Sequence, residues 1–78
     1  MKIKVQHVND DARLIITSGL CRRREHSTLV NKVLEDLPQS RIEEGGFLFR
    51  TTIITGPSVH IMYAQTMLET AGYDVVEV

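Results

Sequence analysis

The chain of 78 residues contains one cysteine, two prolines and no tryptophan. Its single cysteine, Cys21, excludes an internal disulfide, so no covalent link stabilises the core. A small fold with one free thiol is typical of a reducing compartment. We therefore expect the protein to be cytoplasmic.

Long apolar stretches are also missing. No uninterrupted run approaches the roughly 20 apolar residues of a membrane-spanning helix. Residues 1–8 alternate lysine with apolar side chains, whereas a secretory signal has a continuous apolar centre. These absences predict one small soluble domain, residues 1–78, that has no membrane partner.

The charges are nearly balanced, with 9 Lys and Arg against 10 Asp and Glu and a net charge of −1. Apolar residues make up 42% of the chain, which is ordinary for a globular protein and argues against disorder. Residues 1–32 hold seven basic and three acidic residues (+4), and residues 33–78 hold two and seven (−5). This distribution predicts a polarised surface if the fold keeps the two parts separate.

Alternation with period two predicts the first strand. Ile3 and Val5 lie on one side of residues 2–8 and lysines on the other, as in a half-buried strand. Residues 9–11, Asn-Asp-Asp, favour a turn because these side chains tolerate a left-handed backbone. A second strand over residues 13–17 then completes a β-hairpin.

Apolar residues at helical spacing predict a first helix from His26 to Leu37, with Ser27 as its N-cap. Pro38 restricts the residue before it and ends this helix. Residues 38–46 contain charges, a proline and a glycine pair, and we expect them to form a loop.

The second half of the chain predicts a strand, a helix and a strand. Residues 47–55 are rich in aromatic and β-branched side chains, which favour a strand. A helix follows from Pro57 to Ala71, because proline at the first helical position loses no hydrogen bond. Residues 73–78 form a last short strand.

The second helix has a recognisable end. Gly72 occupies the position of a left-handed residue, and the spacing of Leu68 and Tyr73 fits the apolar contact of a Schellman motif. On the same helix Met62 and Tyr63 are adjacent, so we expect one of them to leave the buried stripe.

The element order β-β-α-β-α-β predicts an α+β fold with two layers, a four-stranded mixed sheet and two helices on one face. The last strand–helix–strand unit should be parallel. The strand order is left open. The predicted core comprises Ile3, Val5, Val30, Val33, Leu34, Leu37, Phe49, Ile53, Ile61, Leu68 and Val75.

Three adjacent arginines, Arg22, Arg23 and Arg24, are the strongest local charge feature. Arginine binds carboxylates and phosphates through paired hydrogen bonds and is enriched in binding hot spots. We therefore predict that the three arginines form part of a partner-binding surface. The alternative is a solvated loop that Glu25 and the acidic second half balance.

A nucleic-acid partner is a second alternative for the basic N-terminal half. Lys2, Lys4 and Arg13 could join the arginines on phosphate groups. Phe47 and Phe49 lie in a predicted strand, but the basic-Gly-aromatic pattern of an RNA-recognition motif is missing.

No residue set predicts a catalytic, metal or cofactor site. Cys21 beside three arginines is a candidate thiolate with a histidine as its base, but cysteine is more often a buried structural residue. The histidines and Cys21 lack metal-ligand spacing. The helix start at Gly56, Pro57 and Ser58 is a candidate anion site, although it lacks the second glycine and the lysine of a P-loop.

The sequence therefore predicts a small non-enzymatic binding module, a regulator or inhibitor that acts by protein–protein contact. A nucleic-acid-binding module is the alternative, and an enzyme built across subunits is a third. Because an open sheet exposes its edges, we also predict a homodimer.

Overall fold

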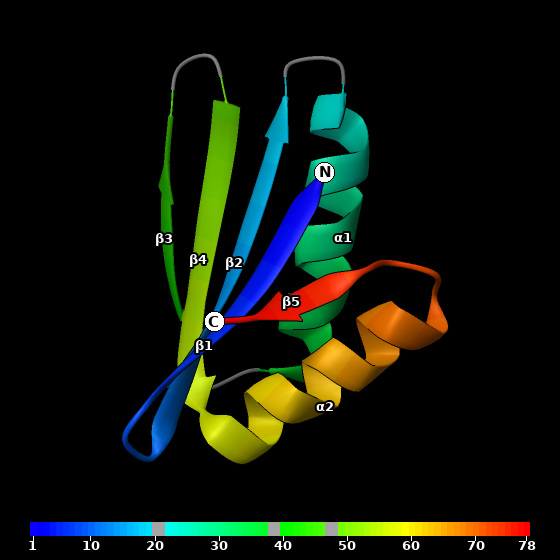
Figure 1. Ribbon diagram of the computed structural model, residues 1–78. Coiled ribbons are helices and arrows are strands. Elements are labelled where there is room, and N and C mark those ends of the chain that lie inside the picture. Colours follow the sequence, from blue (N-terminus) through cyan, green and yellow to red (C-terminus); the bar gives the residue numbers. More distant parts are fainter. Residues whose placement is uncertain (20–21, 38–39, 47–48) are drawn as a thin grey trace.

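The computed structural model describes residues 1–19, 22–37, 40–46 and 49–78 (Figure 1). Within these ranges the chain adopts an α+β fold that contains two helices and a mixed five-stranded sheet. In chain order the elements are β1 (Lys2–Val8), β2 (Asp11–Gly19), α1 (Arg23–Asp36), β3 (Arg41–Gly45), β4 (Phe49–Pro57), α2 (Ser58–Thr70) and β5 (Val75–Glu77).

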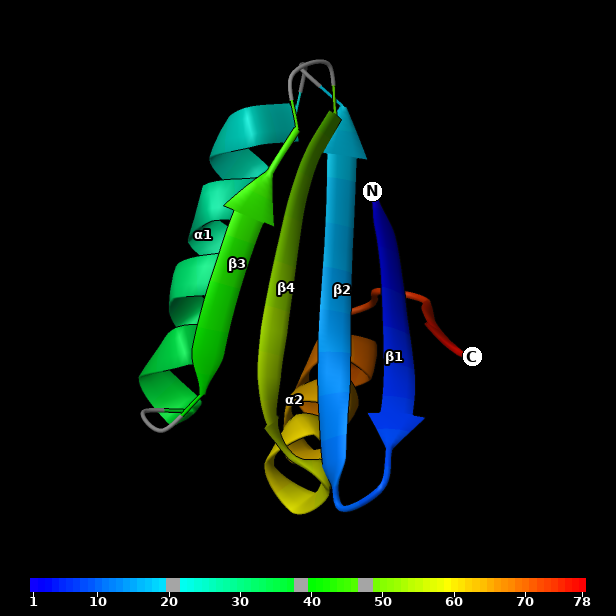
Figure 2. The same ribbon diagram turned by 90° about the vertical axis from the view of Figure 1, so that its left-hand side faces the viewer.

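The strands lie in the order β3-β4-β2-β1-β5. Both helices cover one face of the sheet, and the described elements leave the other face open (Figure 2). The neighbouring pairs are antiparallel except β1 and β5, which are parallel. The predicted parallel relation of the strands before and after α2 is therefore correct, although β2 and β1 lie between them.

The prediction of a loop over residues 38–46 is wrong, because residues 41–45 form the edge strand β3. This strand pairs with β4 from Arg41 opposite Thr55 to Gly45 opposite Thr51. All five of its residues are exposed, so it has no buried stripe that a period-two pattern could reveal. Backbone hydrogen bonds to β4, rather than side-chain burial, determine its conformation.

The hairpin of β1 and β2 confirms the first prediction, and its turn places Asn9 at φ 57°. The helix starts differ from prediction. The helix α1 begins at Arg23, so Ser27 lies within it, and the N-cap Arg22 makes no side-chain capping bond. Pro57 is the N-cap of α2 rather than its first helical residue.

The end of α2 is a Schellman motif, as predicted. Gly72 adopts φ +100°, and its N–H donates to the carbonyl of Glu69 at 3.1 Å. The N–H of Tyr73 donates to the carbonyl of Leu68 at 3.0 Å. This motif turns the chain back over the helix and brings the Tyr73 ring against the core.

Most of the predicted core is confirmed. Seven of its members are buried: Ile3, Val5, Val30, Val33, Leu37, Ile61 and Leu68. Leu34 and Val75 are partly buried against them, whereas Ala71, the last residue of the predicted second helix, is exposed.

The prediction of which β4 side chains face the core is wrong, because the alternation is shifted by one residue. Phe49 is 63% exposed, and Ile53 is only half-buried, because both lie on the open face of the sheet. Thr52 and Ile54 are fully buried on the helix side instead. The adjacent isoleucines of this strand carry no polar alternation that would distinguish its two faces.

Candidate functional site

A hollow of about 630 Å³ lies where the first half of α1 meets the end of α2, and we call it the interhelical groove. Its apolar lining comes from both helices and from the Schellman motif that ends α2. These side chains are Leu29, Met67, Leu68, Ala71 and Tyr73. A concave apolar surface of this volume is in the range of ligand- and peptide-binding sites.

The polar lining of the groove is mostly basic. It includes Arg22, Arg24 and Lys32 from α1 and the residue before it, with Glu25 as the single acidic side chain. The formal charge of these four groups is +2. The positive end of the α1 dipole lies at the same end of the groove, because Arg22 to Glu25 include its first turn.

Glu25 is held by two partners. The Tyr73 hydroxyl donates to Oε1 at 3.0 Å, and Arg22 donates to Oε2 at 2.9 Å. The hydrogen bond from Tyr73, followed by that from Arg22, lowers the pKa of the Glu25 carboxyl. Burial, followed by the bond to Glu25, raises the pKa of Tyr73. Glu25 thus stays ionised and fixes the Tyr73 ring against the groove.

The structure divides the three predicted arginines. Arg22 and Arg24 line the interhelical groove, whereas Arg23 lines a separate hollow beside Glu44 and Arg50. Successive residues at a helix start point in different directions, so adjacency in sequence does not place three side chains on one surface. All three arginines are exposed.

The outer face of α2 is unusually apolar for a surface helix. Val59, Met62 and Tyr63 are 75%, 53% and 60% exposed. Both Met62 and Tyr63 therefore leave the buried stripe, although one was expected to remain in it. Between Ser58 and Thr70 the only charged side chain is that of Glu69. This face has spacing i, i+3, i+4 and forms a second helical stripe opposite the core.

A second hollow of about 400 Å³ extends the groove over this face. Lys32, Met67 and Ala71 line both hollows, so the two are continuous. Tyr63 lines the second one. The two hollows together form one largely apolar surface with a basic border, and Tyr63 connects this surface to the outer face of α2.

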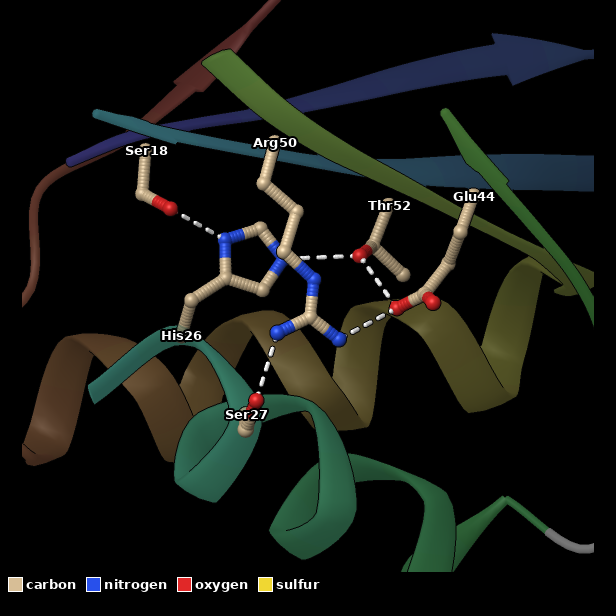
Figure 3. A network of polar contacts seen from close by, with 6 residues as sticks. All are labelled: Ser18, His26, Ser27, Glu44, Arg50 and Thr52. Carbon is tan, nitrogen blue, oxygen red and sulfur yellow. Dashed lines mark hydrogen bonds and ion pairs between the residues drawn. The ribbon is translucent and has the colours of Figure 1, made fainter. Parts of the chain in front are cut away.

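A buried polar network lies between α1 and the sheet (Figure 3). The Ser18 Oγ is 2.5 Å from Nδ1 of His26, and Nε2 of His26 is 2.7 Å from Oγ1 of Thr52. All three residues are buried. At the surface end Glu44 Oε1 accepts from Thr52 at 3.0 Å and from Arg50 at 2.8 Å.

The network determines the tautomer of His26. The single hydroxyl proton of Thr52 is donated to Glu44, so Thr52 must accept a hydrogen bond from Nε2–H. Nδ1 then carries the lone pair and accepts the Ser18 hydroxyl proton. Burial, followed by the charge of Arg50, lowers the pKa of His26. The ring is therefore neutral with both nitrogens satisfied.

The order Ser18, His26, Thr52 resembles a nucleophile, its base and an orienting group. However, Ser18 is only 2% exposed. The network is a structural connection between α1 and the sheet.

Sequence reasoning missed this network, although one signal was present. His26 precedes Val30, Val33 and Leu37 at spacings of 4, 7 and 11 residues. It therefore lies on the buried stripe of α1, toward the start of the helix. A histidine on such a stripe must find polar partners inside the sheet. Of these partners, Ser18 lies on the preceding strand, 8 residues away, whereas Thr52 lies 26 residues away on β4.

The other kinds of site considered from the sequence are a reactive thiol, a metal site and an anion site. Cys21 lies outside the described residues, where its contacts are not defined. No group of three His, Cys, Asp or Glu side chains that could hold a metal occurs in the described ranges. At the start of α2 the Ser58 N–H donates to the Asp10 carbonyl at 3.0 Å, so this amide is not free for an anion.

Neither helix of the described chain is long and apolar enough to cross a membrane. The interhelical groove is the candidate site because it is concave, largely apolar and bordered by basic side chains. Comparisons with protein-family models, with curated proteins and with solved structures found no match to this chain.

Proposed function

We propose that the protein is a non-enzymatic binding module, a regulator or inhibitor that acts by protein–protein contact through the interhelical groove. The observation that carries this proposal is the apolar outer face of α2, where Met62 and Tyr63 are exposed and Tyr63 shares a hollow with Lys32. We expect this contact to take place in the cytoplasm.

The residue types support a protein partner. Tyrosine, methionine and arginine are enriched in protein interfaces, where they combine a large contact area with directed polar contacts. Exposed apolar side chains that gather on one face, rather than singly, are typical of interaction sites. Tyr63, Met67 and Arg24 meet these criteria on one continuous surface.

The nucleic-acid alternative also has a specific observation in its favour. Lys2, Lys4 and Arg13 are exposed on the open sheet face, where Phe49 could stack on a base. Against it, Arg22 and Arg24 lie on the helix side. The basic residues of the N-terminal half are thus divided between two faces, which weakens a single phosphate-binding surface.

The proposal is tested by photo-crosslinking in the host cell. A benzophenone amino acid replaces Thr28 in the groove or Tyr63 on α2, and a matched control replaces Lys4 on the open sheet face. We expect protein adducts from the first two positions. Adducts from Lys4 alone, or adducts that nuclease removes, would contradict the proposal and favour nucleic acid.

A further inference from the structure

We infer that the segment bound in the interhelical groove is an acidic amphipathic helix of a partner protein. The inference rests on the proposed function and names the chemistry of its partner. Three features of the surface support it: its continuous apolar track, the sign of its border charges and walls that contain no strand edge among the described residues.

The apolar track suits a helix that presents one stripe of side chains. The two hollows of about 630 and 400 Å³ share Lys32, Met67 and Ala71, so the surface is elongated rather than a closed pocket. An amphipathic helix places anchors at i, i+3, i+4 and i+7 along such a track. A compact ligand would fill only one of the two hollows.

The border charges select an acidic partner. Arg22, Arg24 and Lys32 line the groove, and its one carboxylate, Glu25, is already bonded to Tyr73 and Arg22. Acidic side chains that flank the apolar stripe of a bound helix would reach these cations. Basic side chains at the same positions would be repelled, which gives the surface its specificity.

The backbone of the walls favours a helix over a strand. Strand addition requires an exposed sheet edge, but the groove is built from α1, from α2 and from the turn that ends α2. At that turn the amides of Gly72 and Tyr73 are bonded to the carbonyls of Glu69 and Leu68. A partner strand therefore finds no strand edge to pair with among the described residues of these walls, whereas a helix satisfies its own backbone.

The test is an NMR titration of the isotope-labelled protein with a synthetic peptide of about 18 residues, long enough to form a helix. Its leucines repeat at i, i+3, i+4 and i+7, and glutamates flank them. We expect saturable shifts of the Thr28, Lys32 and Ala71 amides. A scrambled peptide of the same composition and a peptide with lysine for every glutamate are controls, and neither should produce these shifts.

Charge reversal gives a second readout. Arg24→Glu should weaken binding of the glutamate peptide by about tenfold and strengthen binding of the lysine peptide, because close opposite charges are exchanged for like ones. Arg13→Glu, on the open sheet face, is the matched control and should leave both affinities unchanged.

Failure of this inference differs from failure of the proposed function. No saturable shift up to about 1 mM peptide, or equal shifts with the scrambled peptide, would overturn the acidic helix. So would groove shifts with dodecanoate or single-stranded DNA alone. Protein adducts from Thr28 in the crosslinking experiment would still support the proposed function in those cases.

Discussion

The Nε2 atom of His26 lies 2.7 Å from Oγ1 of Thr52, and this contact joins α1 to β4 between residues 26 positions apart. Ser18 of β2 completes the connection from the other ring nitrogen. The start of α1, which carries Arg24, is thereby fastened to the sheet two residues from the arginine.

Replacement of His26 should destabilise the fold. His26→Ala removes two buried hydrogen bonds, leaves the Ser18 hydroxyl without its partner and opens a cavity. We expect a loss of about 2–4 kcal/mol in the free energy of unfolding, measured by urea denaturation. His60→Ala, at an exposed site on α2, is the matched control. Equal midpoints for the two variants would contradict a structural role of the network.

Stability should fall on mild acidification. The pKa of His26 is lowered from 6.5 in the folded state by burial, so the unfolded chain binds the proton first as the pH falls. The free energy of unfolding therefore decreases below about pH 6.5 and levels off once the pH passes below the folded pKa. Urea titrations across this range test it. His26→Gln should remove this part of the pH dependence, and parallel curves for both proteins would refute the assignment.

The three arginines should differ in binding. Arg24→Ala should weaken capture of the crosslinked partner about tenfold, because Arg24 lines the groove, whereas Arg23→Ala should change it little. Replacing Arg22 as well should weaken it further, and the triple variant should lose no more than about 1 kcal/mol of stability for each exposed charge. If Arg23→Ala has the larger effect, the interface lies beside Glu44 instead.

Gly72 should resist substitution for a backbone reason. Its φ of +100° is strained for any residue with a Cβ, although no atom lies within 4 Å of the position that a Cβ would take. We expect Gly72→Ala to cost about 1–2 kcal/mol in urea denaturation. Gly19→Ala is the control, since Gly19 has the same open space and no positive φ. Equal stability of the two variants would contradict the predicted strain.

Self-association should involve the β5 edge. The sheet order confirms that the C-terminal strand is an edge, and β3 is the other. Arg41, Glu43 and Glu44 protect β3 with charge, whereas Val76 and Val78 are exposed at β5. We expect a homodimer in sedimentation that Val76→Lys dissociates. A monomer at several hundred micromolar would rule out the dimer at this edge.

The sequence alone was sufficient where one local rule governed the backbone. The alternation of Lys2, Ile3, Lys4 and Val5 determined which side of β1 is buried, because side chains of a strand alternate between its faces. Gly72 determined where α2 ends, because the left-handed conformation there excludes most other residues.

Tertiary structure decided the features that depend on distant partners. Residues 41–45 form a strand only because β4 offers them backbone groups, and Thr52 faces inward because His26 and Glu44 satisfy its hydroxyl. The groove itself exists because the chain after α2 folds back against α1, where Tyr73 meets Glu25 from 48 residues away. No spacing along the chain encodes that contact, since it forms only when two helices pack on one sheet.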